Sequence, residues 1–363
     1  MKITFVLPGA NLSGGVRVVA IYADKLSQRG HRVTVVYPAP RDVPVGRKLK
    51  SWVRGRGWPA TPDDGPSHLD QRRIERVVAR PWRPIGDGDV PDADVVVATW
   101  WETAEWVARL SPAKGAKAYF LQHYETFAPQ PAERVKATWK LPLHKIVIAR
   151  WLETIARDDF GDSDVSLVPN AVDLDQFHAP PRGKQSTPTV GTMLSHTWVK
   201  GTDVAFAGFV RACATIPSLR LMVFGDQPPN QTLSLPPNAA YTLRPPQDRI
   251  RDLYASCDAW VMGSRSEGFG LPLLEAMACR TPIISTPTGA GPELADAGAG
   301  FLVRQEDPDD LAAAIVRIVR MPDDQWRALS ARAHAIATAY TWDQAAKTFL
   351  AALERAITSS ARR

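Results

Sequence analysis

The stretch Ser266-Glu-Gly-Phe-Gly-Leu-Pro-Leu-Leu-Glu-Ala276 separates an apolar run from a segment of helical character. The run at 259–262 predicts a buried strand. The proline at position 272 suits the first position of a helix, so a helix is predicted over 272–279. In open α/β sheets, ligands bind at loops that follow the carboxyl ends of strands. The stretch therefore predicts a strand, a ligand-binding loop and a helix.

Two glutamates define the chemistry of this stretch: Glu267 in the loop and Glu275 in the first turn of the predicted helix. Gly268 and Gly270 lie between them and let the backbone approach a ligand closely. Their N–H groups add to the positive end of the helix, which favours phosphate or another oxyanion. The carboxylates can accept hydrogen bonds from the hydroxyls of ribose and sugar rings. These residues alone leave three readings: a catalytic acid/base pair, two contacts with one ligand, and surface charge with ordinary helix capping.

Strands and helices alternate over the rest of the chain. Strand 3–7, a glycine-rich loop at 8–15, a helix from Val16 and strand 32–37 form a β-α-β unit, which implies a parallel sheet. Further strands are predicted at 94–98, 117–121, 189–194, 219–224, 259–262, 282–285 and 300–303. Further helices are predicted from Thr202, over 247–256, from Pro292 and up to Ile357.

The fold class is therefore α/β, with two doubly wound, Rossmann-like domains expected to face a central cleft. We expect an N-terminal domain at 1–178 and a C-terminal domain at 187–340, joined by a linker rich in proline, glycine and polar residues. A C-terminal helix at 341–363 can pack back toward the N-terminal domain. Segment 39–91 is the least regular part of the sequence.

The composition is that of a folded protein of 363 residues, 45% hydrophobic and 23% charged. The sequence has no apolar run of the roughly 18 residues that a membrane span needs. The cysteines lie beside apolar runs and lack metal-ligand spacing, so they read as buried thiols in a reducing compartment. They are Cys213, Cys257 and Cys279. We therefore expect a cytoplasmic protein.

Positive charge is concentrated at 41–58, where six Lys and Arg face one acid, Asp42, with Trp52 and Trp58 among or beside them. Cations interleaved with tryptophan suit the surface of an anionic membrane. They also suit single-stranded nucleic acid, and a solvated loop is the plainer alternative. We expect contact with a membrane surface, which would make the protein peripheral at the inner face of the membrane, and no nucleic-acid partner.

The pattern Glu267-x7-Glu275 resembles the signature of the retaining GT-B glycosyltransferases of family four. The flanking stretches Pro282-Ile-Ile-Ser-Thr-Pro-Thr-Gly-Ala-Gly-Pro-Glu293 and Gly300-Phe-Leu-Val303 are similar to the same family. So are Phe224-Gly-Asp226, Val168-Pro-Asn-Ala-Val-Asp173 and the Gly14-Gly15 loop. The resemblance runs from residue 1 to about 340. It implies a metal-independent enzyme with a nucleoside-diphosphate sugar as co-substrate and no other cofactor.

The resemblance implies that Glu275 holds the nucleotide ribose and that Glu267 contacts the transferred sugar. It assigns Lys200, before Gly201, to the diphosphate leaving group. The other donor-binding residues it implies are Gly268, Phe269, Gly270, Leu271, Thr192, Ser195, Gly14 and Gly15. The arginine that the family usually carries a few residues before this lysine is missing, so we expect Lys200 to act with Ser195, His196 or Thr197.

His123 matches a family histidine near the transferred sugar, and Lys200, His123 and Glu267 are the implied catalytic residues. Gln122, Glu125 and Trp52 are expected on the acceptor side. Asn170 and Asp173 belong to the motif between the domains, where a role in a turn is an equal alternative to ligand contact. The pairs Asp92/Asp94 and Asp162/Asp164 resemble the metal site of the other main glycosyltransferase fold, but we expect no metal there.

The resemblance thus implies retaining transfer of a sugar to a glycan or lipid-linked glycan in the synthesis of cell-surface polysaccharide. The stretch Tyr119-Phe-Leu-Gln-His-Tyr-Glu125 is similar to bacterial polysaccharide enzymes, including some rhamnosyltransferases. Two alternatives stay open. One is a nucleotide-sugar epimerase or a glycosyl phosphorylase of the same fold, and the other is a non-catalytic protein that binds nucleotide sugars.

Overall fold

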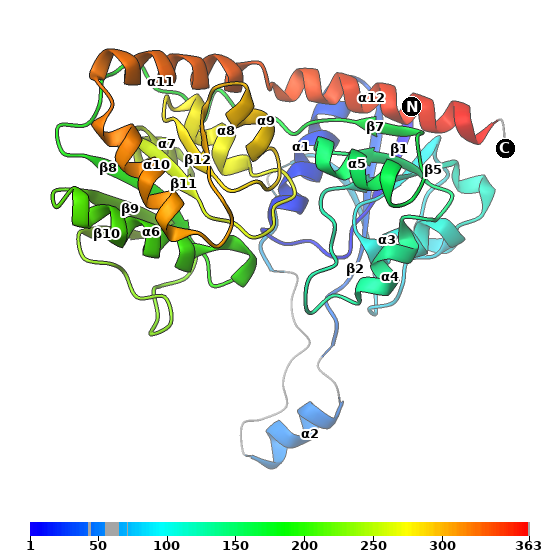
Figure 1. Ribbon diagram of the computed structural model, residues 1–363. Coiled ribbons are helices and arrows are strands. Elements are labelled where there is room, and N and C mark those ends of the chain that lie inside the picture. The colour runs from blue at the N-terminus through cyan, green and yellow to red at the C-terminus, as the bar shows by residue number, and fades with distance from the viewer. Residues whose placement is uncertain (43–44, 55–64, 71, 362–363) are drawn as a thin grey trace. The chain divides into compact units, whose positions relative to one another are not determined.

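The chain forms two units, each built around one parallel sheet, in the computed structural model of Figure 1. The structure describes residues 1–42, 45–54, 65–70 and 72–361. Unit 1 comprises Met1–Val168 and Asp343–Arg363, and unit 2 comprises Pro169–Trp342.

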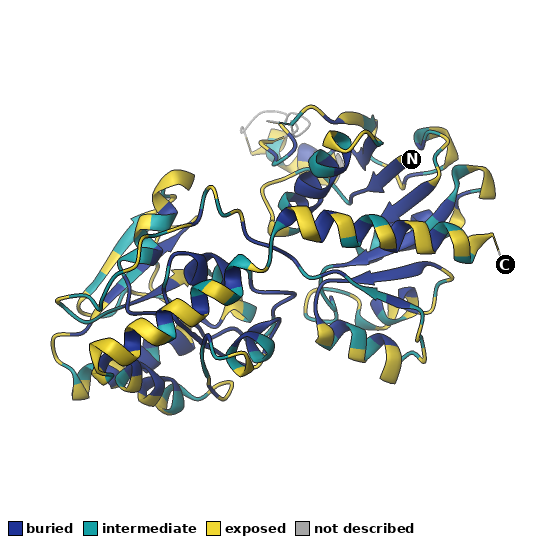
Figure 2. Ribbon diagram, turned by 90° about the horizontal axis from the view of Figure 1, so that it is seen from above, coloured by how far each residue is buried: buried dark blue, intermediate teal, exposed yellow. Residues whose placement is uncertain are grey.

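The sheet of unit 1 has seven strands in the described residues, in the order β3-β2-β1-β4-β5-β6-β7. The strands are β1 (Lys2–Val6), β2 (Arg32–Pro38), β3 (Glu75–Ala79), β4 (Val95–Ala98), β5 (Ala116–Leu121), β6 (His144–Val147) and β7 (Val165–Leu167). Central strands such as β4 are buried on both faces, because helices cover both sides of a doubly wound sheet (Figure 2). This explains the continuous apolar runs that predicted them.

Helices on the chain of unit 1 are α1 (Gly14–Gln28), α2 (Val45–Val53), α3 (Trp101–Arg109), α4 (Ala132–Thr138), α5 (Arg150–Asp158) and α12 (Trp342–Ser360), with short 3-10 turns η1 (Asp87–Asp89) and η2 (Pro112–Lys114). Helix α12 packs on this unit through Phe349. Its ring lies 4.5 Å from that of Tyr22 and 5.0 Å from that of Phe120, centre to centre. Near its start, Asp343 pairs with Lys25 at 2.9 Å.

The sheet of unit 2 has six strands, in the order β10-β9-β8-β11-β12-β13. They are β8 (Thr189–Leu194), β9 (Arg220–Gly225), β10 (Ala239–Leu243), β11 (Ala259–Met262), β12 (Ile283–Ser285) and β13 (Gly300–Leu302). The helices are α6 (Thr202–Thr215), α7 (Ile250–Ala255), α8 (Leu271–Ala278), α9 (Gly291–Asp296), α10 (Pro308–Arg320) and α11 (Asp323–Thr338), with η3 (Trp198–Lys200) and η4 (Gln247–Arg249). The core includes Trp326, whose indole N–H donates to Asp258 O at 2.9 Å.

Both sheets reverse their strand order next to their first strand. In unit 1, β2 and β3 lie on one side of β1 in the sheet, and β4 to β7 lie on the other side. In unit 2 the same relationship holds for β8 and β11. The crevice outside the carboxyl ends of the strands at such a point is where open α/β sheets bind ligands.

Three local expectations differ from the structure. Gly14 and Gly15 were expected in a loop, but α1 begins at Gly14 because the Ser13 hydroxyl accepts a hydrogen bond from Val16 N and caps the helix. Glu275 lies in the second turn of α8 rather than the first, because this helix begins at Leu271. Segment 39–91 contains α2 and the edge strand β3, which its charged and proline-rich sequence did not predict.

Candidate functional site

The carboxyl ends of β8 and β11 in unit 2 bring together two predicted site residues. Lys200 ends η3, which follows β8, and Glu267 lies in the loop after β11. Lys200 Nζ lies 2.9 Å from each carboxylate oxygen of Glu267. The Lys200 side chain is 45% exposed and that of Glu267 10%, so the ammonium group still faces solvent while the carboxylate is enclosed.

One hydroxyl group orients the Glu267 carboxylate, and a second hydroxyl holds the backbone of the residue that carries the first. The buried Ser264 donates to Glu267 Oε1 at 2.9 Å, and Thr286 donates to the Ser264 carbonyl at 2.6 Å. Charge-assisted hydrogen bonds of this kind are stronger than neutral ones. The carboxylate therefore has a defined orientation before any ligand binds.

Arg265 joins the β11–α8 loop to η3. Its guanidinium donates to both carboxylate oxygens of Asp203, at 2.8 and 2.7 Å, and to the Trp198 carbonyl at 2.8 Å. The hydrogen bonds that the guanidinium donates to Asp203 raise the pKa of Arg265 above its already high value. Because this guanidinium is committed within the protein, Arg265 does not replace the arginine that the sequence lacks beside Lys200.

Two glycines allow η3 to approach the β11–α8 loop. Gly201 adopts a φ of +58°, and a side-chain carbon there would lie 1.9 Å from the carbonyl oxygen of Gly263. Such a contact is far shorter than atoms tolerate, so glycine is required for the backbones to meet. The position of Lys200 depends on this close approach.

The glycine loop before α8 is held in place by the segment that follows β12. Gly270 has a φ of +90° and immediately precedes the helix. The Phe269 carbonyl accepts a hydrogen bond from Ala290 N at 2.8 Å, and a side-chain carbon on Gly289 would lie 2.4 Å from that carbonyl. The loop that presents Gly268 and Gly270 is therefore fixed, and Leu271 begins the helix.

Glu275 is enclosed at 7% exposure, and its Oε2 accepts a hydrogen bond from the Tyr254 hydroxyl at 2.8 Å. The Tyr254 ring packs against Trp260 of β11, with centres 4.5 Å apart. The carboxylate is thus oriented by a core residue that the sequence did not single out.

Polar side chains on β8 and in the segment between β8 and η3 form hydrogen bonds within the protein. The Thr192 hydroxyl donates to Val261 O at 2.9 Å, inside the sheet. His196 has Nε2 2.9 Å from Pro228 O and Nδ1 3.0 Å from Asn230 Nδ2, which fits a neutral ring with the proton on Nε2. The Ser195 hydroxyl accepts from Thr197 N at 3.3 Å. Each of these groups already has a partner within the protein, so their contact with a donor stays a prediction.

In unit 1, His123 and Gln122 follow β5 at the carboxyl edge of the sheet. The His123 ring stands edge-on to Phe127 and Trp151, at 5.1 and 5.7 Å. Gln122 Nε2 donates to Gly15 O at 3.3 Å, so the end of β5 and the first turn of α1 meet. The structure thus brings three of the predicted residues of unit 1 to one edge.

Glu125 and Trp52, the other two residues predicted on the acceptor side, differ from Gln122 in how far they are exposed. Glu125 is 1% exposed, and burial raises the pKa of its carboxyl well above the ordinary value, so its side chain does not present a charge at the surface. Trp52 is on α2, where it is 62% exposed. Contact of Glu125 and Trp52 with an acceptor stays a prediction.

The Asp-x-Asp pairs engage cations and backbone of the protein itself. Asp92 pairs with Lys114 at 2.9 Å, Asp94 accepts from Lys2 N at 2.7 Å, and Asp162 pairs with Lys145. Near the start of unit 2, Asp173 accepts hydrogen bonds from the backbone N–H groups of residues 175 and 176 and so stabilises a turn. In the described residues no group of three or more metal-ligating side chains gathers.

Three supporting residues were not predicted: Ser264, Thr286 and Tyr254. Ser264 and Thr286 carried a signal, since each lies within two residues of the end of a predicted strand, where ligand-binding side chains concentrate. Tyr254 carried none, because its contact with Glu275 depends on how separate elements pack.

Comparison with known proteins identifies the fold and relates part of the chain to a family. Residues 186–321 match the family model described as Glycosyl transferases group 1. Over 233 residues the chain is 32% identical to the D-inositol 3-phosphate glycosyltransferase of Mycobacterium avium, a match covering 58% of this chain and 53% of that protein. The chain thus spans about half the length of the curated relatives it matches.

Two solved structures are similar over nearly the whole chain. Sucrose-phosphate synthase of Thermosynechococcus elongatus is 19% identical with a TM-score of 0.74, covering 99% of this chain and 100% of that one. HepE of Anabaena, solved with UDP and glucose, is 18% identical with a TM-score of 0.71, covering 98% and 99%. With the two parallel sheets, these likenesses confirm the predicted fold class, GT-B, with two Rossmann-like units.

Proposed function

We propose that the protein is a retaining glycosyltransferase, which moves a sugar from a nucleoside diphosphate to a hydroxyl of a glycan or lipid-linked glycan. The observation that supports this most is the contact of Lys200 Nζ with both oxygens of Glu267 where the strand order of unit 2 reverses. A cation, an oriented carboxylate and a glycine loop at a helix start together suit a sugar linked to a diphosphate.

Each residue then has one role in donor binding. Glu275, oriented by Tyr254, accepts hydrogen bonds from the ribose hydroxyls, and Glu267 accepts them from the transferred sugar. The N–H groups of the glycine loop and the Lys200 ammonium face the diphosphate oxygens. A nucleotide sugar as the donor is supported by the matched relative, which is named a glycosyltransferase, and by the similar structure of HepE, which was solved with UDP and glucose.

The transfer step breaks the bond between the anomeric carbon and the phosphate oxygen and forms a bond from that carbon to the acceptor oxygen. The acceptor proton passes to the departing phosphate on the same face, so the configuration is retained and no protein nucleophile is required. The rate comes from positioning and from stabilisation of the negative charge on the leaving diphosphate by Lys200 and the loop amides. His123 would lie on the side of the transferred sugar and contact its hydroxyls.

Lys200 and backbone amides supply this charge stabilisation without a bound cation. We therefore propose that no metal and no cofactor besides the donor is required. Full transfer activity in excess EDTA supports this, whereas loss of activity that Mg²⁺ or Mn²⁺ restores contradicts it.

A thermal-shift panel tests the function: UDP-glucose, UDP-N-acetylglucosamine, GDP-mannose and, for rhamnosyl transfer, dTDP-L-rhamnose. A donor at 100 times its Kd stabilises the folded protein by about 2.7 kcal/mol. The donor that stabilises is then incubated with acceptors, D-inositol 3-phosphate and short lipid-linked glycans. The anomeric proton coupling of the product reports retention. Stabilisation by none of the donors contradicts the proposal.

The same assay separates the alternatives. Isomerisation of the donor, with no acceptor present, identifies an epimerase, and sugar release by phosphate alone identifies a phosphorylase. Donor binding without turnover on any acceptor identifies a binding protein. Acceptor-dependent release of nucleoside diphosphate, with an equal amount of glycosylated product, supports the transferase.

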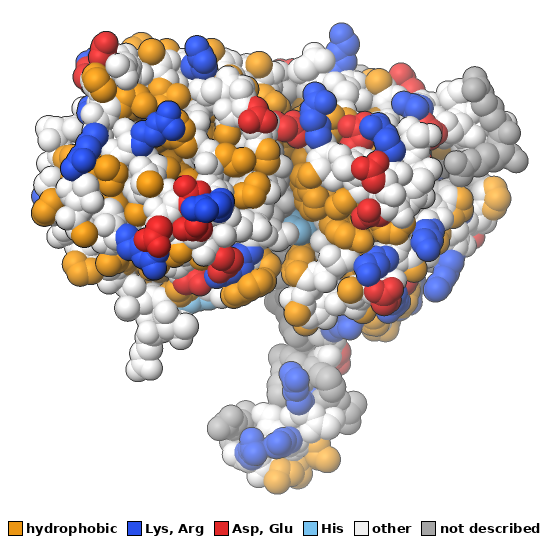
Figure 3. Space-filling view, in the orientation of Figure 1, with side chains coloured by type: hydrophobic (Ala, Val, Ile, Leu, Met, Phe, Trp, Pro, Cys, Tyr) orange, Lys and Arg blue, Asp and Glu red, His pale blue; other side chains and the backbone are white. Residues whose placement is uncertain are grey.

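We also propose that helix α2 rests on an anionic membrane surface. Leu49, Trp52 and Val53 share one face and are 52, 62 and 72% exposed. Two exposed cations, Arg47 and Lys50, lie on the other side of the helix, and the exposed Arg54 directly follows its last residue. Figure 3 shows hydrophobic and basic side chains gathered on this part of the molecule. Each cation near anionic lipid contributes about 1 kcal/mol, and tryptophan suits the interface.

This placement would make the protein peripheral to the inner face of the membrane. Among the described residues, no helix combines the length and apolarity of a membrane span. Trp58 and residues 55–57 of the predicted segment 41–58 lie outside the described residues, so the proposal rests on α2.

A further inference from the structure

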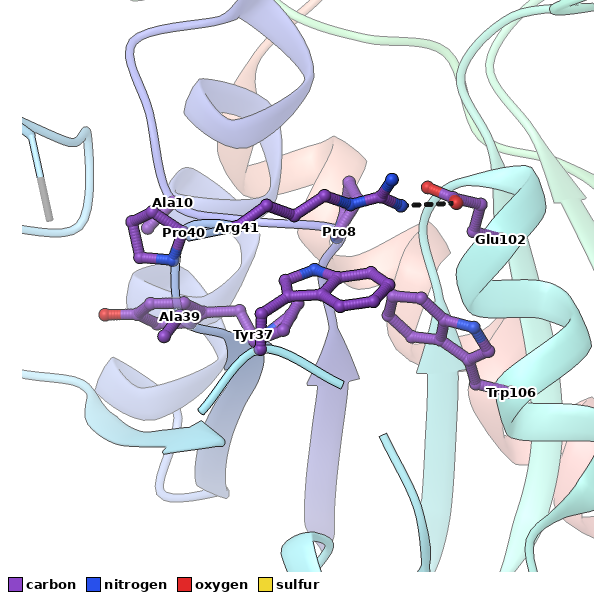
Figure 4. A pocket seen from close by; sticks show the side chains of 11 residues that line it. Pro8, Ala10, Tyr37, Ala39, Pro40, Arg41, Glu102 and Trp106 are labelled. Atoms are coloured by element: carbon purple, nitrogen blue, oxygen red, sulfur yellow. Dashed lines mark hydrogen bonds and ion pairs between the residues drawn. The ribbon is translucent and has the colours of Figure 1, made fainter. Parts of the chain in front are cut away.

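A pocket of about 220 Å³ lies in unit 1, at the point where the order of its strands reverses (Figure 4). Its walls come from the loop after β1 (residues 8–10), the end of β2 and the residues after it (37–41), Trp82, and helix α3 after β4. None of the residues assigned above to the donor or to catalysis lines it. It nevertheless occupies the carboxyl edge of the sheet that also carries Gln122 and His123.

The pocket has three aromatic walls. Tyr37 closes the end of β2, Trp106 stands on α3, and Trp82 lies between. Tyr37 and Trp106 are buried in the protein, so their rings are fixed in place before a ligand enters. Rigid aromatic faces of this kind suit a ligand with a flat apolar face.

The charged groups of the pocket form one pair. Arg41 donates to Glu102 Oε1 at 3.2 Å, and its guanidinium carbon lies 4.1 Å from the centre of the Trp82 ring. Figure 4 shows Arg41 reaching from the β2 side toward Glu102 on α3, with Tyr37 and Trp106 beneath them in this view. The pair offers hydrogen-bond donors and acceptors side by side while adding no net charge.

We propose that this pocket holds one six-membered polyhydroxylated ring of the acceptor, a pyranose or a cyclitol. The C–H face of such a ring is apolar and lies well against the negative face of an aromatic side chain. Its edge carries adjacent hydroxyls, which donate to Glu102 and accept from Arg41. The assignment of the ring to the acceptor rests on the proposed glycosyltransferase function.

Size and charge favour a single neutral ring over other ligands. Pockets for drug-sized molecules have volumes of about 300–1,000 Å³, so this one suits one ring rather than several. Its cation is already paired, so a phosphate would meet Glu102 as well as Arg41. We call these five residues the ring pocket: Tyr37, Arg41, Trp82, Glu102 and Trp106. The ring pocket therefore binds only the ring of the acceptor, and any phosphate or lipid of the acceptor would lie outside it.

Helix α3 supplies a matched control. Three residues after Glu102, Glu105 accepts from Arg134 at 2.7 and 2.6 Å, and Arg134 lies 4.8 Å from the Trp101 ring. This second group repeats the carboxylate, guanidinium and indole of the ring pocket but lines no part of it. Glu105→Ala therefore removes the same kind of ion pair as Glu102→Ala, but at a place where no ligand is predicted to bind.

The experiment compares the natural protein with Glu102→Ala, Trp82→Ala and Glu105→Ala. Ligand-observed saturation-transfer NMR measures binding of methyl α-D-glucopyranoside, methyl α-D-mannopyranoside and myo-inositol, with glycerol as the open-chain control. This arm needs neither donor nor turnover. Circular dichroism and thermal unfolding verify that each variant is folded. The second arm measures the KM of the donor and of the acceptor in the transfer reaction.

We expect saturation of at least one ring compound, lost in Glu102→Ala and Trp82→Ala and kept in Glu105→Ala. The pyranosides and myo-inositol distinguish the two sources of the ring. We expect the acceptor KM to rise at least about tenfold in Glu102→Ala, as loss of a hydrogen bond to a charged group predicts. It should also rise in Trp82→Ala, which loses an aromatic contact with the ring, and the donor KM should stay unchanged in both variants. Equal saturation in all four proteins, or in none, overturns the pocket.

The two arms keep this proposal separate from the proposed function. Ring binding that needs the pocket, in a protein that transfers no sugar, supports the pocket and contradicts the glycosyltransferase. Transfer with an unchanged acceptor KM in Glu102→Ala and Trp82→Ala overturns the acceptor role while the glycosyltransferase stands.

Discussion

Lys200 Nζ lies 2.9 Å from both carboxylate oxygens of Glu267, although the residues are 67 positions apart in the chain. The contact exists because β8 and β11 are neighbours in the sheet and the loops after them converge. It places a half-exposed cation beside an enclosed, oriented acid.

Lys200→Ala should mainly slow the transfer step, because the ammonium stabilises charge that develops on the leaving diphosphate. Removing one such group lowers kcat by about 10²–10³-fold, and we expect a much smaller change in donor affinity. Steady-state kinetics with the best donor, and donor binding by calorimetry, measure the two effects. Arg211→Ala, which removes the exposed ion pair of Arg211 with Asp309 in the same unit, is the control. A weaker donor affinity with an unchanged kcat would rule out this role.

Glu275→Ala should mainly weaken donor binding, because this carboxylate is assigned to the ribose. Loss of hydrogen bonds to a buried charged group corresponds to a decrease in affinity of about 10–100-fold. Tyr254→Phe keeps the acid but removes the hydroxyl that orients it, so its donor affinity should fall by less. Calorimetric titration with the donor and with its free nucleoside diphosphate gives both values. A kcat that falls as strongly as in Lys200→Ala, at unchanged donor affinity, would show that Glu275 belongs to the chemical step instead.

Features that depend on one short segment could be predicted from the sequence, and features that depend on contacts between distant segments could not. The bounds of β11 equal the predicted run 259–262, because all four of its residues are buried and a buried strand needs only its own apolar side chains. β3 was missed, because an edge strand with an exposed, charged start has no such run. The bond of Tyr254 to Glu275 and the ring pocket depend on packing between separate elements. No periodicity within one element encodes those contacts.

Gly201→Ala should destabilise unit 2 and displace Lys200, because the added carbon would lie 1.9 Å from Gly263 O. Gly30→Ala is the matched control: it also stands at positive φ, at +84°, but no atom lies within 4 Å of the added carbon. Gly30→Ala therefore measures the backbone strain alone, about 1–2 kcal/mol. We expect Gly201→Ala to lose at least about 1–3 kcal/mol more, the cost of overpacking. Urea unfolding measures the difference, and equal losses would mean that the two backbones can separate freely.

The buried carboxyl of Glu125 should make stability fall as pH rises. Burial raises its pKa in the folded state well above the ordinary value of 4.5, so above pH 4.5 the unfolded chain binds fewer protons than the folded one. Stability then decreases from about pH 4.5 up to the raised pKa, by at most about 1.4 kcal/mol per pH unit. Glu125→Gln removes this slope, so its stability relative to the natural protein should improve from pH 5 to pH 8. Urea unfolding at both pH values tests this, with Glu105→Gln as control. A pH-independent difference contradicts it.

Helix α2 should bind anionic membranes through its exposed tryptophan and its cations. We expect the protein to sediment with vesicles of phosphatidylglycerol and phosphatidylcholine, but not with phosphatidylcholine alone, and to be released by added salt. Trp52→Ser should weaken this binding about tenfold or more, since burying a large apolar side chain contributes about 1.5–3 kcal/mol. Trp198→Ser is the control, because Trp198 is as exposed, at 68% against 62%, but lies in unit 2 beside an acid-paired arginine. If both variants bind the anionic vesicles as the natural protein does, α2 is not the contact with the membrane.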